Sequence, residues 1–184
     1  MRDRPVIAIV IGCGLALGPS PLLSQRLGLT VGGGVGVVSP SGSFGNVEQT
    51  GWHVMGTAMR GIRGALTGIL DLDYAHTTHQ GGVAGASTFG GGTVNAAVVL
   101  GAESRTVRPF GLLGVGFYRL NVDVPGFGAA NVTKSAWDAG VGVLVHVGRG
   151  MLGYVDARTV SVATKPQRTT FRPLSLGVVV PIGS

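Results

Sequence analysis

The sequence is poor in several kinds of residue that stabilise or mark ordinary proteins. It contains a single cysteine, Cys13, so the chain cannot form an internal disulfide, and the part after residue 25 has no thiol chemistry. Charged residues make up only 12% and aromatic residues only 6% of its 184 residues. Chains of this kind are often disordered, but a hydrophobic content of 45% argues against disorder.

Long hydrophobic runs are also missing. No stretch of about 18 apolar residues occurs, which is the length that a membrane-spanning helix needs. The mean hydropathy is nevertheless positive, at +0.42. Two classes remain: a soluble β protein rich in Gly and Val, and a membrane β-barrel, in which apolar residues occupy every second position of each strand.

Clustered charge is missing as well. The 14 Lys and Arg residues outnumber the 8 Asp and Glu residues, for a net charge of +6, but they are scattered along the chain. A nucleic-acid interface needs a basic patch or stripe, so we expect no nucleic-acid partner. Scattered arginines suit strand ends that meet anionic lipid head groups. The 34 glycines follow no phosphate-loop spacing and precede no helical pattern, so no nucleotide or other cofactor is predicted.

The first 25 residues have the pattern of a secretion signal. Arg2 and Arg4 precede an apolar run over residues 5–18 that is too short to span a bilayer. Cys13 ends a lipoprotein-like Val-Ile-Gly-Cys box, in which it would be acylated. We favour the interpretation that Cys13 belongs to the apolar run, because that run continues past it. The sequence therefore predicts a signal peptide over 1–25 and one exported domain over 26–184.

The stretch from residue 107 to residue 160 alternates strictly between two faces. One face carries Phe117 and Trp137, and the other carries Gly116 and Asp138. A period of two over such lengths predicts β-strands. An apolar face opposite a face of charges and glycines is typical of strands whose apolar side meets lipid.

The same alternation recurs along the chain and predicts eight strands. They cover residues 27–37, 52–60, 63–76, 93–103, 107–121, 135–147, 151–162 and 171–182. Polar loops over 39–50, 77–92, 122–134 and 163–170 alternate with short turns, as when turns face the periplasm and loops face outside. We therefore predict an all-β fold, an eight-stranded antiparallel up-and-down transmembrane β-barrel, with both termini at the periplasmic end.

The pattern resembles the family of small eight-stranded, porin-like outer-membrane β-barrels over essentially the whole chain after the leader. The resemblance rests on Arg108-Pro109-Phe110 followed by spaced glycines, on AGVGVLVHVGRG at 139–150 and on YVDAR at 154–158. In that family, strand seven often carries an acid and a base two residues apart on its lumen side. Asp156 and Arg158 occupy those places.

The resemblance implies a place in the outer membrane of a diderm bacterium. The partners that it implies are the outer-membrane lipids and lipopolysaccharide, and the barrel assembly machinery. The last strand resembles the family's assembly signal, with Ser175, Gly177, Val180 and Ile182 at the matching spacing. The chain ends Pro-Ile-Gly-Ser where family members usually end on an aromatic residue, and this difference concerns recognition by that machinery.

The inner face is predicted to carry ion pairs that fix the shape of a lumen filled by side chains. An eight-stranded barrel is just wide enough for its own side chains. Charges buried there must be paired, because removing an ion from water is costly. We interpret Asp71 and Asp73 as ion-pair partners and not as a metal site. The predicted network consists of Arg63, Asp71, Asp73, Glu103, Arg108, Asp138, Asp156 and Arg158.

The predicted function follows from the predicted location. We expect a structural or surface-interaction role, in which the outer loops contact an external ligand. The alternatives are a narrow channel for small solutes, a lipid-modifying barrel enzyme, and a soluble exported binder of opposite polarity. Neither enzyme activity nor a metal site is predicted, because no histidine has a serine and an acid at a recognisable spacing. The histidines considered are His53, His76, His79 and His146.

Overall fold

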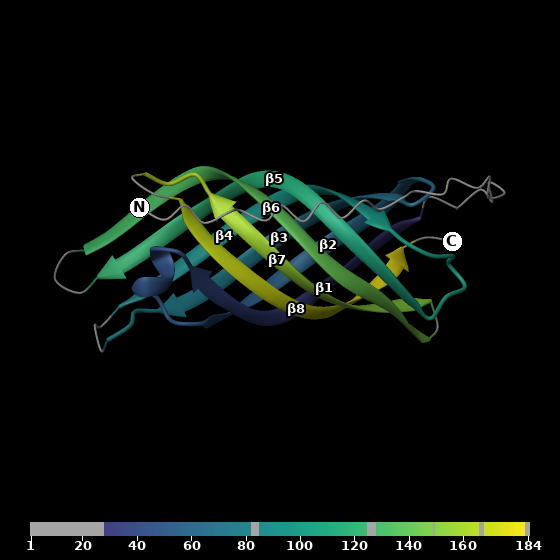
Figure 1. Cartoon of the computed structure of the whole chain (residues 1–184), viewed down its shortest axis with the longest axis horizontal. Coiled ribbons are helices and arrows are strands. Elements are labelled where there is room, and N and C mark those ends of the chain that lie inside the picture. The colour runs from purple at the N-terminus through teal and green to yellow at the C-terminus, as the bar shows by residue number, and fades with distance from the viewer. Residues whose placement is uncertain (1–27, 82–84, 125–127, 149, 166–167, 183–184) are drawn as a thin grey trace, which may run out of the picture.

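The computed structural model describes residues 28–81, 85–124, 128–148, 150–165 and 168–182. The predicted signal peptide, with Cys13, lies outside these residues. Eight antiparallel strands and one short helical turn make up the fold (Figure 1). They are β1 (Leu29–Ser41), η1 (Phe44–Asn46), β2 (Gly51–Arg63), β3 (Leu66–Thr78), β4 (Ala86–Val99), β5 (Val107–Val124), β6 (Gly128–Gly148), β7 (Met151–Val162) and β8 (Thr169–Ile182).

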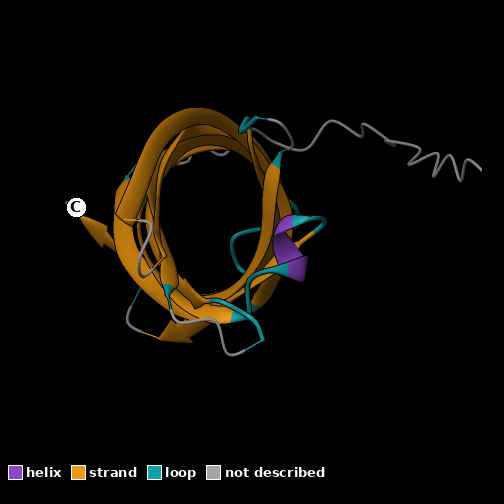
Figure 2. Cartoon of the chain, turned by 90° about the vertical axis from the view of Figure 1, so that its left-hand side faces the viewer, coloured by secondary structure: helices purple, strands orange, loops and turns teal. Residues whose placement is uncertain are grey.

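The strands close into a barrel. Each strand pairs with the next one in sequence, and β1 pairs with β8 from Leu29 opposite Ile182 to Ser41 opposite Thr170. Figure 2 looks along the barrel and shows the strands as one closed ring. Closure lets the ladders satisfy the backbone polar groups internally, which a bilayer requires of any spanning structure. The predicted eight-stranded up-and-down barrel is confirmed.

The outer wall is apolar and the inner wall holds the charges. Leu72, Phe117 and Val141 point outward and are 63%, 67% and 66% exposed, whereas Asp71 and Asp156 point inward and are 0% and 1% exposed. A soluble barrel would have the opposite polarity. The exposed apolar band is what a lipid environment stabilises. In the described part of the chain, no helix is long and apolar enough to cross a membrane.

The two ends of the barrel differ. The connections β1–β2, β3–β4, β5–β6 and β7–β8 meet at one end, which we call the loop end, at the left of Figure 1. The other three connections meet at the opposite end, which we call the terminus end. The first residue of β1, Leu29, and the last residue of β8, Ile182, lie there too. The start of the first strand and the end of the last strand therefore lie at the same end of the barrel, as an even number of strands requires.

Two predicted loops are largely strand. Residues 77–92 were predicted as a loop, but β3 extends to Thr78 and β4 begins at Ala86. Residues 122–134 were also predicted as a loop, but β5 extends to Val124 and β6 begins at Gly128. Both stretches contain several glycines, which have low strand propensity, and pairing with neighbouring strands overrides that propensity.

The predicted turn at residues 61–62 is also wrong. β2 continues to Arg63 through a register shift between Gly61 and Arg63, and the chain turns at Gly64, whose φ is +54°. A left-handed backbone conformation favours glycine, so Gly64 is the better turn residue.

Candidate functional site: a charged layer inside the barrel

A layer of charged side chains crosses the middle of the lumen, centred on Arg158 of β7. Its Nε and Nη2 donate to Oδ2 of Asp156 at 2.8 and 2.7 Å. Its Nη1 donates to Oδ2 of Asp71 on β3 at 2.6 Å and lies 3.6 Å from Oδ2 of Asp138 on β6. One guanidinium therefore joins carboxylates from three strands.

The neighbouring strand β4 adds neutral polar groups to this layer. Asn95 donates through Nδ2 to Oδ2 of Asp71 at 2.9 Å and to Oγ1 of Thr93 at 3.0 Å. The side chains of Asp71, Asp138 and Arg158 are almost fully buried, at 0%, 1% and 5% exposure. Because these charges are buried, each one depends on its partners, and removing one partner would leave the others uncompensated.

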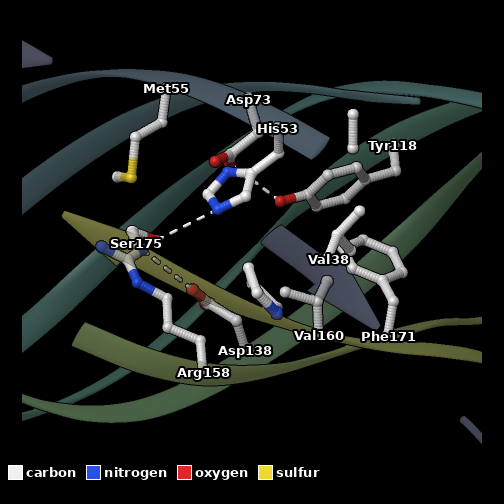
Figure 3. Close-up of a pocket in the computed structure, with 12 residues that line it drawn as sticks. Val38, His53, Met55, Asp73, Tyr118, Asp138, Arg158, Val160, Phe171 and Ser175 are labelled. Carbon is white, nitrogen blue, oxygen red and sulfur yellow. Dashed lines mark hydrogen bonds and ion pairs between the residues drawn. The ribbon is translucent and has the colours of Figure 1, made fainter. Parts of the chain in front are cut away.

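The layer contains more acceptors than the donors around it use. Among the described residues, one carboxylate oxygen each of Asp71, Asp138 and Asp156 has no hydrogen-bond partner, and neither has Oδ1 of Asn95. A small cavity borders the layer and is lined by Asp138, Arg158, His53, Asp73 and Ser175, among others (Figure 3). Its volume of about 10 Å³ is close to the minimum for one water molecule.

A second pair of polar contacts lines the same cavity. His53 and Ser175 approach to 3.3 Å between Nε2 and Oγ, and Tyr118 donates to Oδ2 of Asp73 at 2.9 Å (Figure 3). His53 and Ser175 are 3% and 2% exposed. A serine beside a histidine is the start of a nucleophilic site, but this pair is enclosed and the adjoining space is too small for a lipid or any other organic substrate.

Apolar clusters close the lumen on both sides of the charged layer. Toward the loop end, Phe89 packs between Phe44 and Phe171, with ring centroids 5.5 and 5.3 Å away. Toward the terminus end, Phe110 and Leu144 lie in a second buried cluster. The sequence analysis assigned charges and glycines to the inner face. The structure adds these large apolar side chains, which fill the space that the glycines leave open.

Several glycines on the inner wall leave the space that a large side chain on a neighbouring strand occupies. A Cβ added to Gly142 would lie 2.5 Å from the ring of Phe110, and one added to Gly91 would lie 2.5 Å from the ring of Tyr118. The ring of Tyr154 occupies the corresponding space at Gly177. Because these glycines have no side chain, the rings can approach the inner wall closely, which keeps an eight-stranded lumen filled without overcrowding.

The structure divides the eight residues of the predicted network. It brings Asp71, Asp138, Asp156 and Arg158 together, and it places Asp73 beside them on Tyr118. The remaining three, Arg63, Glu103 and Arg108, lie near the terminus end. They are not in the layer.

The placement of these three residues has a physical reason. Arg63 ends β2 and is exposed, because the register shift moves the turn beyond it. Glu103 lies after β4 in an exposed connection and not within a strand. Arg108 is half-buried, and no ion pair with it occurs within the described ranges. Assigning Arg63 and Glu103 to the buried layer was therefore wrong.

The predicted assembly-signal residues occupy both walls of β8. Ser175 and Gly177 face the lumen, where they contact His53 and Tyr154. Val180 and Ile182 face outward and pair with Val31 and Leu29 of β1. Their recognition by an assembly machinery stays a prediction.

Sequence reasoning missed a polar cluster at the loop end. Glu48, in the β1–β2 connection, accepts hydrogen bonds from Thr77 at 2.7 Å and Ser87 at 2.6 Å, and its carboxylate lies 2.7 Å from Nδ1 of His79. Glu48 is 3% exposed. Figure 2 shows that η1, in this connection, lies at the rim of the barrel. The sequence did not predict this cluster, because Glu48 is the single acid in its polar loop and its partners lie on or next to β3 and β4, far along the chain.

The histidine pair of the HTTH sequence is separated by the structure. His79 belongs to the Glu48 cluster, whereas the ring of His76 lies 5.8 Å from that of Trp52. In the part of the chain that the structure describes, no group of three or more His, Cys, Asp or Glu residues could hold a metal ion.

Comparisons with known proteins point to one fold. No family model matches the sequence, and no curated protein matches it. Among solved structures, the barrel is similar to Neisserial surface protein A, with a TM-score of 0.67 at 18% identity over 84% of this chain and 97% of that one. It is similar to OprG of Pseudomonas aeruginosa, with a TM-score of 0.59 at 11% identity over 87% and 98%.

A third similar structure is Ail, the attachment invasion locus protein of Yersinia pestis. Its TM-score is 0.56 at 12% identity, over 83% of this chain and 99% of that one. At these identities the likeness establishes the fold, and the outward apolar band establishes its orientation toward lipid. The chain has the fold of the small eight-stranded outer-membrane β-barrels.

Proposed function

We propose that this protein is an integral outer-membrane barrel that acts at its loop end, by contact with an extracellular macromolecule, and whose lumen does not conduct. The feature that carries the proposal is the β5–β6 hairpin. β5 runs to Val124 and β6 begins at Gly128, whereas β7 ends at Val162, opposite Ala136. The first residues of β6 therefore extend beyond the end of their β7 partner.

This part of β6 presents an open strand edge. Residues 128–135 pair with β5, and within the described ranges the hydrogen bond from Ala163 N to Ser135 O is the last on the β7 side. Because backbone groups alternate in direction along a strand, the N–H and C=O of Thr133 and Asn131 point toward the same open side as those of Ser135. An extended peptide of a partner can add to such an edge as a further strand.

Two features of the lumen support a closed barrel. The cavity beside the charged layer has a volume of only about 10 Å³, and apolar clusters lie on both sides of that layer. The enclosed His53–Ser175 pair also argues against a lipid-modifying activity, because neither side chain reaches the lipid-facing wall. A structural and surface-interaction role fits these features better than transport or catalysis.

A proline substitution tests the open edge. Thr133→Pro removes one donor from the free side and keeps the β5–β6 ladder, whereas Val132→Pro removes a donor that faces β5. Cells that expose the protein should adhere to surfaces coated with extracellular-matrix or serum proteins, and Thr133→Pro should lower that adherence at unchanged surface amounts. Val132→Pro serves as the matched disruption of the hairpin. Wild-type cells that adhere no better than cells lacking the protein would contradict the proposal.

A further inference from the structure

A groove runs across the outer wall of the barrel from β3 to the β7–β8 connection. Large apolar side chains border it, and Gly92, Ser135 and Ala163 form its low floor. Its volume is about 660 Å³. The large bordering residues are Leu70, Val94, Val115, Phe117 and Trp137. All five of these point outward, so the groove opens toward lipid and not toward the lumen.

The groove is long and narrow. It follows two neighbouring cross-strand rows, one from Leu70 on β3 through Val94 and Val115 to Trp137, the other from Gly92 through Phe117 and Ser135 to Ala163 just after β7. Four steps between strands of about 4.8 Å each give a length of about 19 Å. This shape suits an extended hydrocarbon chain better than a compact ligand.

A cationic side chain lies at the loop end of the groove. Arg168, in the β7–β8 connection, lines it and donates through Nη1 to Oγ of Ser161 at 3.5 Å. Ser161 faces the outer wall, opposite Trp137, yet is only 3% exposed. Within the described ranges Arg168 has no carboxylate partner. One long hydrogen bond therefore places the exposed guanidinium beside the groove, with no carboxylate among the described residues to neutralise it.

Other exposed arginines extend this positive region around the rim. Arg119 lies two residues after Phe117 on β5, and Arg172 lies on β8 next to the same connection. Both are exposed, and neither forms an ion pair in the described part of the chain. The outward acid near this end, Asp123, lies further along β5 toward the hairpin tip.

We propose that this groove binds one acyl chain of a phosphorylated outer-leaflet glycolipid, the lipid part of lipopolysaccharide, and that its phosphate contacts Arg168. An acyl chain fits the length and apolar border of the groove, and the charge at the loop end selects an anionic head group. The site rests on the proposed orientation, in which the loop end faces outside. Proteolysis of the loops on intact cells tests that orientation separately.

Trp137 provides a direct reporter of chain occupancy. The sequence contains two tryptophans, so Trp52→Phe leaves Trp137 as the single one. The protein is reconstituted in phosphatidylcholine vesicles whose chains carry bromine, which quenches tryptophan on contact. Unbrominated lipid A is then added to one sample and unbrominated phosphatidylglycerol to another, both at the same mole fraction of total lipid. Lipid A should relieve the quenching with an affinity about fivefold above that of phosphatidylcholine, the effect of about one lysine or arginine near the surface.

Matched variants separate the head group from the chain. Arg168→Gln should abolish the preference for lipid A, whereas Arg60→Gln, an exposed arginine at the terminus end, should leave it unchanged. Ser135→Phe fills the floor of the groove and should prevent relief. Ala157→Phe adds the same ring to the outer wall away from the groove and should not.

Three results would overturn the proposal. Equal relief by phosphatidylglycerol would show that an ordinary phospholipid is the ligand. No relief by lipid A in a correctly folded barrel would show that the groove is only a generic lipid contact. A gain of quenching on dilution into lipid A-free brominated vesicles, together with a crosslinked dimer through a Ser135→Cys substitution, would identify a second copy of the chain as the occupant. None of these results affects the adherence test of the loop end.

Discussion

Arg158 on β7 and Asp71 on β3 are joined directly across the lumen, with Nη1 of the arginine 2.6 Å from Oδ2 of the aspartate. The two strands are four positions apart in the ring of eight, so they lie on opposite walls. Backbone hydrogen bonds hold each strand only to its neighbours. This contact therefore fixes the cross-section of the barrel in a way that the ladders alone do not.

Replacing Arg158 by Met should destabilise the barrel by about 3–5 kcal/mol, because it leaves three buried carboxylates without a cation. Urea-induced unfolding in lipid vesicles, followed by tryptophan fluorescence, measures this change. Adding Asp71→Asn, Asp138→Asn and Asp156→Asn to Arg158→Met should restore a large part of the lost stability. A single Arg158→Met variant as stable as wild type would show that the layer contributes nothing.

Gly142→Ala should destabilise the barrel by about 1–3 kcal/mol, the cost of overpacking. The added methyl group would lie 2.5 Å from the ring of Phe110 and equally close to the carbonyl oxygen of Val155. Gly56→Ala is the matched control, since a Cβ there would meet nothing within 4 Å, and its effect should stay within about 1 kcal/mol. Equal effects of the two substitutions in the same unfolding assay would refute the seating of Phe110 on Gly142.

Glu48→Ala should loosen the β1–β2 connection without unfolding the barrel. It removes the acceptor of Thr77 and Ser87 and the partner of His79. Hydrogen exchange should accelerate about tenfold or more at the amides of Gln49, which donates to the carbonyl of Thr78 at the end of β3, and of Gln80, which donates to the carbonyl of Val47. Val47→Ala, at an exposed neighbouring position, should leave these rates unchanged; an equal acceleration there would point to general loop mobility.

Planar lipid bilayers should show no sustained open channel for the wild-type protein. The reason is the filled lumen, where the cavity lined by His53, Asp138 and Arg158 measures only about 10 Å³. The control is a wider barrel of known conductance in the same membrane. A steady, voltage-independent current through the folded protein, identified by its faster or slower gel migration without boiling, would instead favour the channel alternative.

The outward and inward faces were predictable because strand side chains alternate with a period of two. Leu72 and Asp71 could be assigned to opposite walls without knowing any partner strand. Asp156 and Arg158 were likewise recognisable as an inward pair from their spacing. Periodicity is a local property, and it survives whatever the register between strands.

Contacts that depend on register were not predictable. Nothing in the sequence places Glu48 against Ser87, or Phe110 on Gly142, because each pair comes from segments far apart in the chain. The glycines of 85–92 also led to a wrong prediction, since their low strand propensity suggested a loop. Pairing of Gly90 and Gly92 with both β3 and β5 overrides that preference.

The seam between β1 and β8 joins the two most distant parts of the described chain. Leu29 meets Ile182, and the pairing continues to Ser41 and Thr170. Contacts of such large sequence separation are the slowest to form during folding. A chain truncated before β8 would keep seven strands yet leave two long unsatisfied backbone edges in hydrocarbon, so synthesis has to be complete before the protein has any stable membrane form.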